Sequence, residues 1–372
     1  MWVSELQLAS YRNYEQLNIQ LAVGPTLIFG ENGRGKTNLV EALGFLANLE
    51  SHRSGAKGTL VKQGHTTAQI SATANHNGRA VKVAAEISTE KTNTFFLNSK
   101  PQRRASDMLG NLSVVIFAPE DLDIVRRDPS DRRAFLDVTM ASLKPRLGQL
   151  KADYDRVLKQ RNALLKSARG VKDPDISTLE IWDDQLVALG SEIIKERAEL
   201  ITKLSPPLQS FYTALADSDD MISLRLVSLG EGDIEEQIDR QHIAQQLRAR
   251  LAEKRTSEFE RGVTLVGPHR DDLVIEKNDL LARTHASQGE AWSIALGLRL
   301  AVASLLRDGP GGDPILILDD VFAVLDSGRR KRLVDFVVDY EQVLVTSADK
   351  DMAPELSWSK KLEVLGGGVR ET

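Results

Sequence analysis

The segment GENGRGKT, residues 30–37, fits the phosphate-binding pattern G-x-x-x-x-G-K-[ST]. Glycines let backbone N–H groups point at phosphate oxygens, and a helix that follows offers its positive end to the same anion. Lys36 would reach the β and γ phosphates, and the Thr37 hydroxyl would coordinate Mg²⁺. A chance match in a glycine turn is the alternative. The predicted nucleotide-contacting residues are Gly30, Glu31, Asn32, Gly33, Arg34, Gly35, Lys36 and Thr37.

Two carboxylates follow an apolar run in ILILDD, residues 315–320. A metal site beside a phosphate loop needs such acids, because Asp319 would hold Mg²⁺ through water and Asp320 would orient or deprotonate the attacking water. Two acids at a strand end can also form a plain helix cap. Because the phosphate loop is also present, a catalytic site is favoured over a helix cap. Its predicted catalytic residues are Lys36 and Asp320, and its predicted metal ligands are Thr37 and Asp319.

A third segment, SQGE at 287–290, precedes an apolar helical pattern over 291–306. A hydroxyl and free N–H groups at a helix N-terminus form a second anion site. Alone, this segment is an ordinary capping turn. Its place about two dozen residues before the paired acids is what gives Ser287, Gln288 and Gly289 a predicted role.

The flanking elements have the order that the phosphate motif requires. Residues 1–30 alternate apolar and polar side chains, which predicts an antiparallel pair and then a buried strand that enters the glycine loop. Residues 38–48 show helical spacing, and residues 66–98 predict a meander of strands. The apolar runs ILIL and VLVT predict parallel strands of an α/β sheet, with the first fifty and last hundred residues in one sheet.

Between these parts the spacing becomes helical. One helix is predicted from Ser142 to about Lys166, a second from Trp182 to Leu204 ending at Pro206 and Pro207, and a third from Ile234 to about Phe259. The predicted division is residues 1–138 and 261–372 as the two parts of one head domain and residues 139–260 as an inserted helical arm.

Composition limits the function classes. The chain has 372 residues and no Cys, which excludes a disulfide framework and a thiolate metal site. The N-terminal stretch lacks a basic region followed by an apolar core, and no apolar run reaches the roughly 18–20 residues needed to span a bilayer. We therefore expect a cytoplasmic protein without a membrane partner.

The net charge of −5 means that a polyanion such as DNA would be held by local basic clusters. Solvated helix faces are the alternative for each cluster, and base stacking is not indicated because aromatic residues are only 5% of the chain. The candidates are Arg103 and Arg104; Arg126, Arg127, Arg132 and Arg133; Arg248, Arg250, Lys254 and Arg255; and Arg329, Arg330, Lys331 and Arg332.

The three motifs occur in the order typical of the ABC class of ATPases. More specific motifs accompany them: YRNY at 11–14, GENGRGKTNLVEAL at 30–43, FAPEDLDIVRRDPSDRRAFLD at 117–137, YDRVLKQRNALLK at 154–166, GPHRDD at 267–272, SQGE at 287–290 and LDDVFAVLD at 318–326. On these motifs, which run from the first strand to the last hundred residues, the sequence resembles the RecF recombination-mediator family. The resemblance implies an α/β fold, an SMC-like ABC-type P-loop ATPase head with a mixed sheet and a β-meander lobe, plus an inserted α-helical arm.

The resemblance also implies a function. Ser287, Gln288 and Gly289 of one subunit would complete the ATP site of the other in an ATP-dependent homodimer, with Asp326 near the dimer seam. That dimer would clamp duplex DNA, gapped DNA or a single-strand/double-strand junction in the nucleoid and help to load RecA with RecR and RecO. Weak, DNA-stimulated hydrolysis would release it.

Several positions depart from the class pattern. His285 and Ala286 precede Ser287 where many ABC proteins have an apolar residue. Asp320 stands where many have Glu, which is consistent with slow turnover. Thr346 and Ser347 replace the usual switch histidine. Glu120 stands where SMC heads carry a loop glutamine.

Two alternatives stay open from the residues. One is a clamp in which ATP joins the subunits and hydrolysis is negligible, and the other is a transporter-type ABC subunit. Two motif roles are also open: GPHRDD can be a salt-bridge corner or act in catalysis, and Arg12 can approach the nucleotide or pack.

Overall fold

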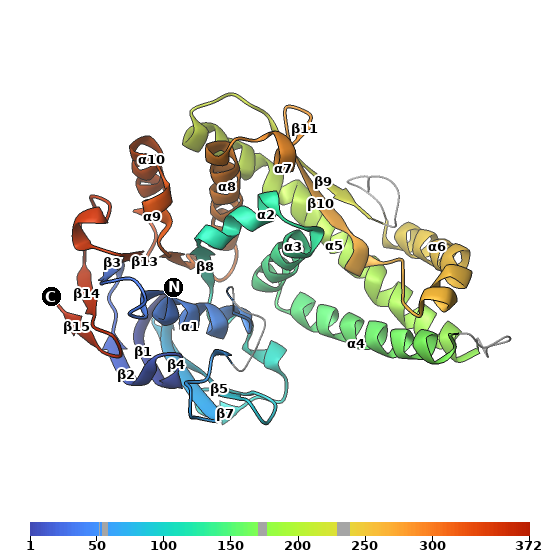
Figure 1. Ribbon diagram of the computed structural model, residues 1–372, viewed down its shortest axis with the longest axis horizontal. Helices are drawn as coiled ribbons and strands as arrows, with labels where there is room; N and C mark the ends of the chain where they lie inside the picture. The colour runs from blue at the N-terminus through green and yellow to red at the C-terminus, as the bar shows by residue number, and fades with distance from the viewer. Residues whose placement is uncertain (52, 54–58, 170–176, 229–238) are drawn as a thin grey trace. The chain divides into compact units, whose positions relative to one another are not determined.

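The computed structural model describes residues 1–51, 53, 59–169, 177–228 and 239–372, and the chain divides into two compact units (Figure 1). The first unit comprises Met1–Leu122, Ser210–Asp219 and Ser287–Thr372. The second comprises Asp123–Gln209 and Asp220–Ala286. The domain limits at residues 138 and 260 stay a prediction.

A six-stranded sheet in the first unit leads into the phosphate loop, in the order β15-β14-β3-β13-β12-β8. Neighbouring strands from β14 to β8 are parallel, and β15 joins β14 antiparallel. All residues of β8, β12 and β13 are buried, as expected for parallel strands covered on both faces. The carboxyl ends of β3, β13, β12 and β8 therefore meet at one edge. The strands are β3 (Gly24–Phe29), β8 (Val114–Phe117), β12 (Ile315–Leu318), β13 (Gln342–Ser347), β14 (Lys360–Val364) and β15 (Val369–Glu371).

An antiparallel sheet of the first unit has the order β2-β1-β4-β5-β6-β7. Its strands are β1 (Trp2–Tyr11), β2 (Tyr14–Gln20), β4 (Thr67–His76), β5 (Arg79–Ser88), β6 (Thr94–Leu97) and β7 (Lys100–Pro101). The predicted meander over residues 66–98 is thus confirmed. The prediction that all of the first fifty residues share a sheet with the last hundred is wrong, because β1 and β2 pair within the meander and only β3 joins the parallel sheet. Alternating side chains bury one face of the meander, whereas β3 buries consecutive residues.

Helix α1 (Lys36–Asn48) follows the phosphate loop and belongs to a core shared by both sheets. Leu39 and Leu43 of α1 lie in this core with Leu8 and Ile70 of the meander and Ile317 of the parallel sheet. Burial of an apolar face stabilises a helix more than propensity does. The helix that presents its N-terminus to the loop is thus fixed in place by packing.

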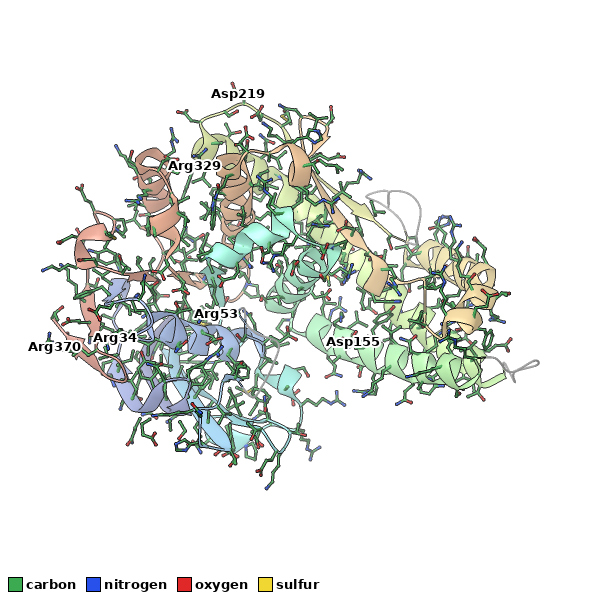
Figure 2. The ribbon with its side chains drawn as sticks, in the orientation of Figure 1. Arg34, Arg53, Asp155, Asp219, Arg329 and Arg370 are labelled. Atoms are coloured by element: carbon green, nitrogen blue, oxygen red, sulfur yellow. The ribbon has the colours of Figure 1, made fainter. Side chains whose placement is uncertain are left out.

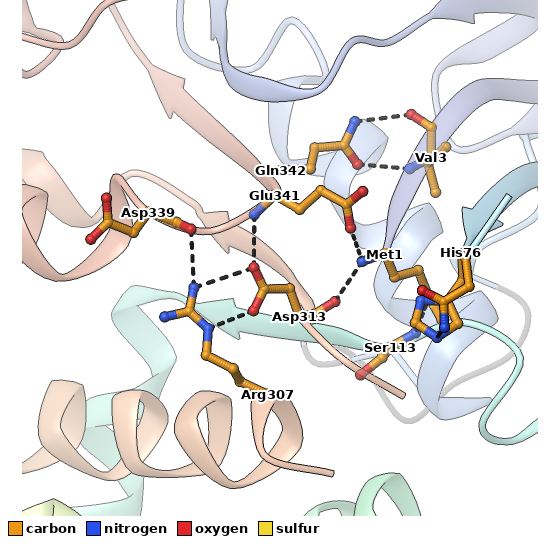
Figure 3. A network of polar contacts seen from close by, with 10 residues as sticks. Met1, Val3, His76, Ser113, Arg307, Asp313, Asp339, Glu341 and Gln342 are labelled. Carbon is orange, nitrogen blue, oxygen red and sulfur yellow. Dashed lines mark hydrogen bonds and ion pairs between the residues drawn. The ribbon is translucent and has the colours of Figure 1, made fainter. Parts of the chain in front are cut away.

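A polar network joins the N-terminus of the chain to residues 307–342 within the first unit (Figure 3). The Met1 amino group donates to the Asp313 carbonyl at 3.0 Å. The buried side chain of Gln342 accepts from the Val3 amide at 2.8 Å and donates to the Val3 carbonyl at 2.9 Å. Arg307 pairs with Asp313. These contacts tie β1 to the starts of β12 and β13, so they link the meander to the parallel sheet.

Three helices complete the carboxyl-terminal part of the first unit: α8 (Gln288–Arg307), α9 (Val321–Val324) and α10 (Ser327–Val337). In the described part of the chain, α8 is long and apolar enough to cross a membrane. However, 72% of its apolar window is buried inside the structure, and a core helix passes the same test.

The second unit is mainly helical. It contains α3 (Pro129–Leu143), α4 (Arg146–Ser167), α6 (Arg240–Arg261), α7 (Ala282–His285), most of α2 (Leu122–Arg126) and of α5 (Ser177–Ala216), and a sheet of β9 (Ile222–Val227), β10 (Asp272–Lys277) and β11 (Leu280–Leu281).

The predicted end of the second helix is wrong, because α5 continues through Pro206 and Pro207 to Ala216. Each proline removes one backbone donor. The Ser205 hydroxyl donates to the Ile201 carbonyl at 2.8 Å, and buried Leu204 and Leu208 hold the helix on both sides of the prolines. The predicted third helix is seen from Arg240, and its predicted start at Ile234 lies outside the described residues.

Candidate nucleotide-binding site

The phosphate loop, residues 30–35, is held from behind by the turn between β1 and β2. The Tyr14 hydroxyl donates to the Gly35 carbonyl at 3.0 Å, and the Asn13 amide donates to the Arg34 carbonyl at 2.8 Å. Asn13 also accepts from Asn38 of α1 at 2.8 Å. These contacts engage the carbonyls of Arg34 and Gly35 and fix the loop against the turn.

Gly35 shows why this position needs glycine. Its φ of 114° lies in a region that L side chains rarely adopt. An added Cβ would also lie within 2.6–2.8 Å of side-chain atoms of Asn13 and Tyr14. The loop and the turn therefore pack so closely that no side chain fits at position 35.

Lys36 is buried, and its ammonium group folds back onto the loop. It donates to the carbonyls of Gly30 at 2.7 Å and Glu31 at 3.2 Å, and to the Asn32 side chain at 3.2 Å. Burial lowers the pKa of Lys36, and the charges of Asp320 and Asp319 partly offset that effect. A phosphate group would replace carbonyl oxygens as the acceptor and favour the charged form of the lysine.

Asp319 lies at the end of β12, where it accepts two hydroxyl hydrogen bonds. The donors are Thr346 at the end of β13, at 2.7 Å, and Thr37 at the start of α1, at 3.1 Å. Burial raises the pKa of Asp319 to about 6; the Asp320 charge adds to this rise, and the two hydroxyls oppose it. A cation beside this carboxylate would remove the electrostatic cost of its burial.

Asp320 adopts a left-handed backbone conformation, with φ 53° and ψ 15°. Its amide donates to the Thr346 hydroxyl at 2.8 Å, which fixes the turn between β12 and α9. A non-glycine residue in this region is strained by roughly 1–2 kcal/mol, a strain that often marks functional sites. The turn holds Asp320 near enough to Lys36 and Asp319 to influence the pKa of both.

The residues fit a magnesium ion. Among the described residues, no group of three or more His, Cys, Asp or Glu side chains could hold a metal alone. Mg²⁺ in phosphate-binding sites is instead bound by one or two protein oxygens together with phosphates and water. Thr37 and Asp319, with oxygens 3.1 Å apart, offer that pair of ligands.

Thr346 occupies the strand end where the sequence lacks a switch histidine, and it contacts both acids of the site. Ser347 instead turns its hydroxyl to the Asp349 carbonyl at 2.7 Å. Glu120 follows β8 and pairs with Arg53 at 4.0 Å. Its charge contributes to the raised pKa of Asp319.

The predicted residues at the start of α8 and Asp326 at the start of α10 form a second group. Ser287 caps α8 in a reciprocal capping box with Glu290, whose amide donates to the serine hydroxyl at 3.3 Å and whose carboxylate accepts from the serine amide at 2.7 Å. Asp326 caps α10 and accepts from the Arg329 amide at 2.9 Å. The Arg329 guanidinium lies against Gly289, so Arg329 connects the start of α8 with the start of α10. The sequence had suggested only a DNA-binding role for this arginine. Figure 2 marks Arg34 in the phosphate loop and Arg329 on α10.

Sequence reasoning missed the roles of Asn13, Tyr14 and Thr346. YRNY marked the family but gave no function for its last two residues. Arg12 in the same motif pairs with buried Glu41 of α1, through contacts of 2.8 Å and 2.5 Å. In this structure Arg12 therefore packs on the helix, which was one of its two open roles.

GPHRDD lies in the second unit, in a corner of ion pairs. Fully buried Asp271 pairs with fully buried Arg197 at 2.9 Å and accepts from the Ser228 hydroxyl at 2.5 Å. Arg132 binds Asp272 through contacts of 2.6 Å and 3.0 Å. These contacts give the motif a structural role in this unit.

Many of the candidate DNA-binding arginines are engaged inside their own unit. Arg126, Arg132 and Arg133 contact Ala286, Asp272 and Asp271. The remaining engaged candidates and their partners are Arg127 with Asp123, Arg248 with Asp184, Arg250 and Lys254 with Glu253, Arg255 with Asp183, Arg329 with Asp326, Arg330 with Leu325 and Arg332 with Asp217. Arg103, Arg104 and Lys331 are exposed.

The sequence is similar to proteins of one known family. A profile described as the RecF/RecN/SMC N terminal domain matches residues 2–365. The "DNA replication and repair protein RecF" of Clavibacter sepedonicus is 44% identical over 390 residues, covering 100% of this chain and 95% of the relative. The protein of the same name from Streptomyces avermitilis is 43% identical, with 99% of each chain covered.

Solved structures with a similar fold indicate the same family. One described as "the recombination mediator protein RecF-ATP in RecFOR pathway" superposes with a TM-score of 0.91 at 27% identity, covering 100% of this chain and 97% of the other. A Smc head domain from Pyrococcus furiosus superposes with a TM-score of 0.54 at 15% identity, with 100% and 96% covered, which shows a shared fold. The predicted fold class, an ABC-type ATPase head with an inserted helical part, is confirmed, and the chain belongs to the RecF family of DNA replication and repair proteins, within the RecF/RecN/SMC group.

Proposed function

We propose that this protein is an ATP-dependent DNA-binding protein of recombinational repair in the cytoplasm, associated with the nucleoid. ATP binding joins two copies into a dimer that clamps duplex or gapped DNA, and slow hydrolysis stimulated by DNA releases it. With RecR and RecO as partners, the dimer helps to load RecA. Membership of the RecF family and the ATP named in the description of a similar structure support this proposal.

One observation carries the proposal. Three strand ends bring Lys36, Thr37, Asp319 and Thr346 together, although the last two lie about three hundred residues beyond the loop in sequence. The ammonium group, the helix N-terminus and the loop amides supply positive charge for a triphosphate. The buried carboxylate supplies the ligand for the accompanying cation.

Hydrolysis needs a group that handles water, and Asp320 is proposed for that role. The bound Mg²⁺ would be held by Thr37 and Asp319 and would neutralise charge on the β and γ phosphates. Lys36 would hold the same phosphates by charge-assisted hydrogen bonds. Asp320, fixed in its left-handed turn, would orient the attacking water or accept its proton.

The dimer is proposed from the second group. Ser287, Gln288 and Gly289 at the N-terminus of α8 would contact the γ-phosphate held by a partner, with Asp326 beside them. The N-terminus of α8 favours an anion, and Gly289 presents no side chain of its own to obstruct it. ATP would thus be enclosed only when two copies meet.

Two variants separate nucleotide binding from dimerisation. Lys36→Ala should weaken ATP binding by roughly 10- to 150-fold, since a hydrogen bond to a charged group contributes about 1.5–3 kcal/mol. Ser287→Arg should bind ATP as the wild type does and remain monomeric, because its side chain would fill the face that meets the partner. Unchanged ATP affinity in the first variant, or normal ATP-dependent dimers in the second, would contradict the proposal.

A further inference from the structure

Arg329 joins the two segments that the proposed function places at the dimer seam, and our inference rests on that function. Its guanidinium lies beside Gly289. A Cβ added to Gly289 would lie 3.0 Å from both terminal nitrogens and 3.2 Å from the central carbon of Arg329. The arginine therefore occupies the space that a side chain at position 289 would need.

The same guanidinium makes two polar contacts. Its Nε donates at 3.0 Å to the Ser293 hydroxyl, which is buried and itself donates to the Gly289 carbonyl at 3.1 Å. Its terminal nitrogen pairs with Asp326, the cap of α10. Arg329 thus links the first turn of α8 to the first turn of α10.

The position of the Arg329 guanidinium depends on the neighbouring group that offsets its charge, the Asp326 carboxylate. A cation at a helix N-terminus is opposed by the helix dipole. Here Arg329 stands beside two such N-termini, and the carboxylate of Asp326 offsets its charge. Arg329 is 23% exposed and Asp326 is 53% exposed, so a partner surface that met these turns would also meet the ion pair.

We propose that Arg329 is a positioning residue of the composite ATP site. By bridging Gly289, Ser293 and Asp326 it holds the SQGE turn and the Asp326 turn at a fixed spacing, so that both reach the partner subunit together. Its planar fork is what permits this, because one edge serves the Ser293 hydroxyl while the other serves the Asp326 carboxylate. A lysine, as a point charge, can serve only one of them at a time.

Dimerisation gives the first test. Arg329→Ala should bind Mg²⁺-ATP with a dissociation constant within about twofold of the wild-type value, because its contacts lie outside the phosphate loop. The ATP-dependent dimer should be weakened at least tenfold, and Arg329→Lys should restore only part of that loss. The double variant Ser293→Ala/Arg329→Ala should be no worse than Arg329→Ala alone, because both changes break one bridge.

Hydrogen exchange in the monomer gives a second test that does not need a dimer. Arg329→Ala should speed amide exchange in both turns, residues 287–293 and 326–331, and leave exchange in α1 unchanged. Lys331→Ala is the matched control on the same helix, since Lys331 is exposed.

The two tests keep the inference apart from the proposed function. Wild-type protein that stays monomeric with ATP would refute the dimer, and the exchange experiment would still decide the role of Arg329. Wild-type dimerisation by Arg329→Ala, or exchange that changes in only one of the two turns, would overturn the inference.

Discussion

Gly35→Ala tests whether the turn between β1 and β2 shapes the phosphate loop. The new Cβ would lie 2.6 Å and 2.7 Å from the two polar atoms of the Asn13 side chain and 2.8 Å from the Tyr14 hydroxyl. Those are the groups that bind the loop carbonyls. The substitution must therefore displace either the turn or the loop, and we expect ATP binding to fail while the fold persists.

Gly33→Ala is the matched control in the same loop. Gly33 also has a positive φ, 79°, but no heavy atom lies within 4 Å of an added Cβ. Backbone strain alone should cost about 1–2 kcal/mol, or roughly a 5- to 30-fold loss of ATP affinity. The contacts at Gly35 should add the cost of an overpacked site, about 1–3 kcal/mol, which corresponds to roughly a further 5- to 150-fold.

Titration with a fluorescent ATP analogue would measure both affinities, with thermal unfolding to show that each variant is folded. The double variant Asn13→Ala/Gly35→Ala removes most of the obstructing atoms, so it should recover part of the affinity that Gly35→Ala loses. Equal losses for Gly33→Ala and Gly35→Ala would contradict this prediction, because the turn would then have no influence on the loop.

Three further predictions concern other parts of the chain. Arg103→Glu/Arg104→Glu should reduce the slope of log affinity for DNA against log salt by about 1.8, if both exposed arginines contact phosphates, as fluorescence anisotropy over a salt series would show; an unchanged slope would exclude this cluster. Burial lowers the pKa of His269 to about 4, below its unfolded value of about 6.5, so its contribution to stability is complete above pH 6.5 and is lost as the pH falls. Between pH 7.5 and 5 that loss is about 2 kcal/mol, and urea unfolding of His269→Gln should lack it; an identical pH dependence in both proteins would contradict the assignment. Arg197→Met should destabilise the protein by about 3–5 kcal/mol in the same assay, because it leaves the buried Asp271 carboxylate without its partner, and a loss below about 1 kcal/mol would show that Asp271 is neutral or solvated.

The candidate nucleotide-binding site could be predicted from the sequence because local patterns indicate it. A glycine loop between a strand and a helix predicts phosphate binding, and two acids after an apolar strand predict metal binding, each from its own segment. Parallel strands then bring their carboxyl ends to one edge, so Thr37 and Asp319 had to lie close together once both strands joined one sheet.

Contacts between distant side chains could not be predicted, since nothing in the local sequence fixes them. Runs of arginine suggested DNA binding, yet Arg132 is buried beside the Asp272 carboxylate. Gly289 fitted a phosphate-binding role, but only the structure shows Arg329 against it. Pro206 and Pro207 predicted a helix end, and tertiary burial of the flanking leucines outweighed that local signal.

Asp320→Asn is suited to testing the proposed ATP-dependent dimer, because asparagine tolerates the left-handed conformation seen at φ 53° and removes only the charge proposed to handle the attacking water. Its state of assembly would be measured by sedimentation with Mg²⁺ and either ATP or ADP, with and without a gapped duplex. We expect dimers with ATP, monomers with ADP, and a more stable ATP-bound dimer when the gapped duplex is present. Monomers under every condition would contradict it.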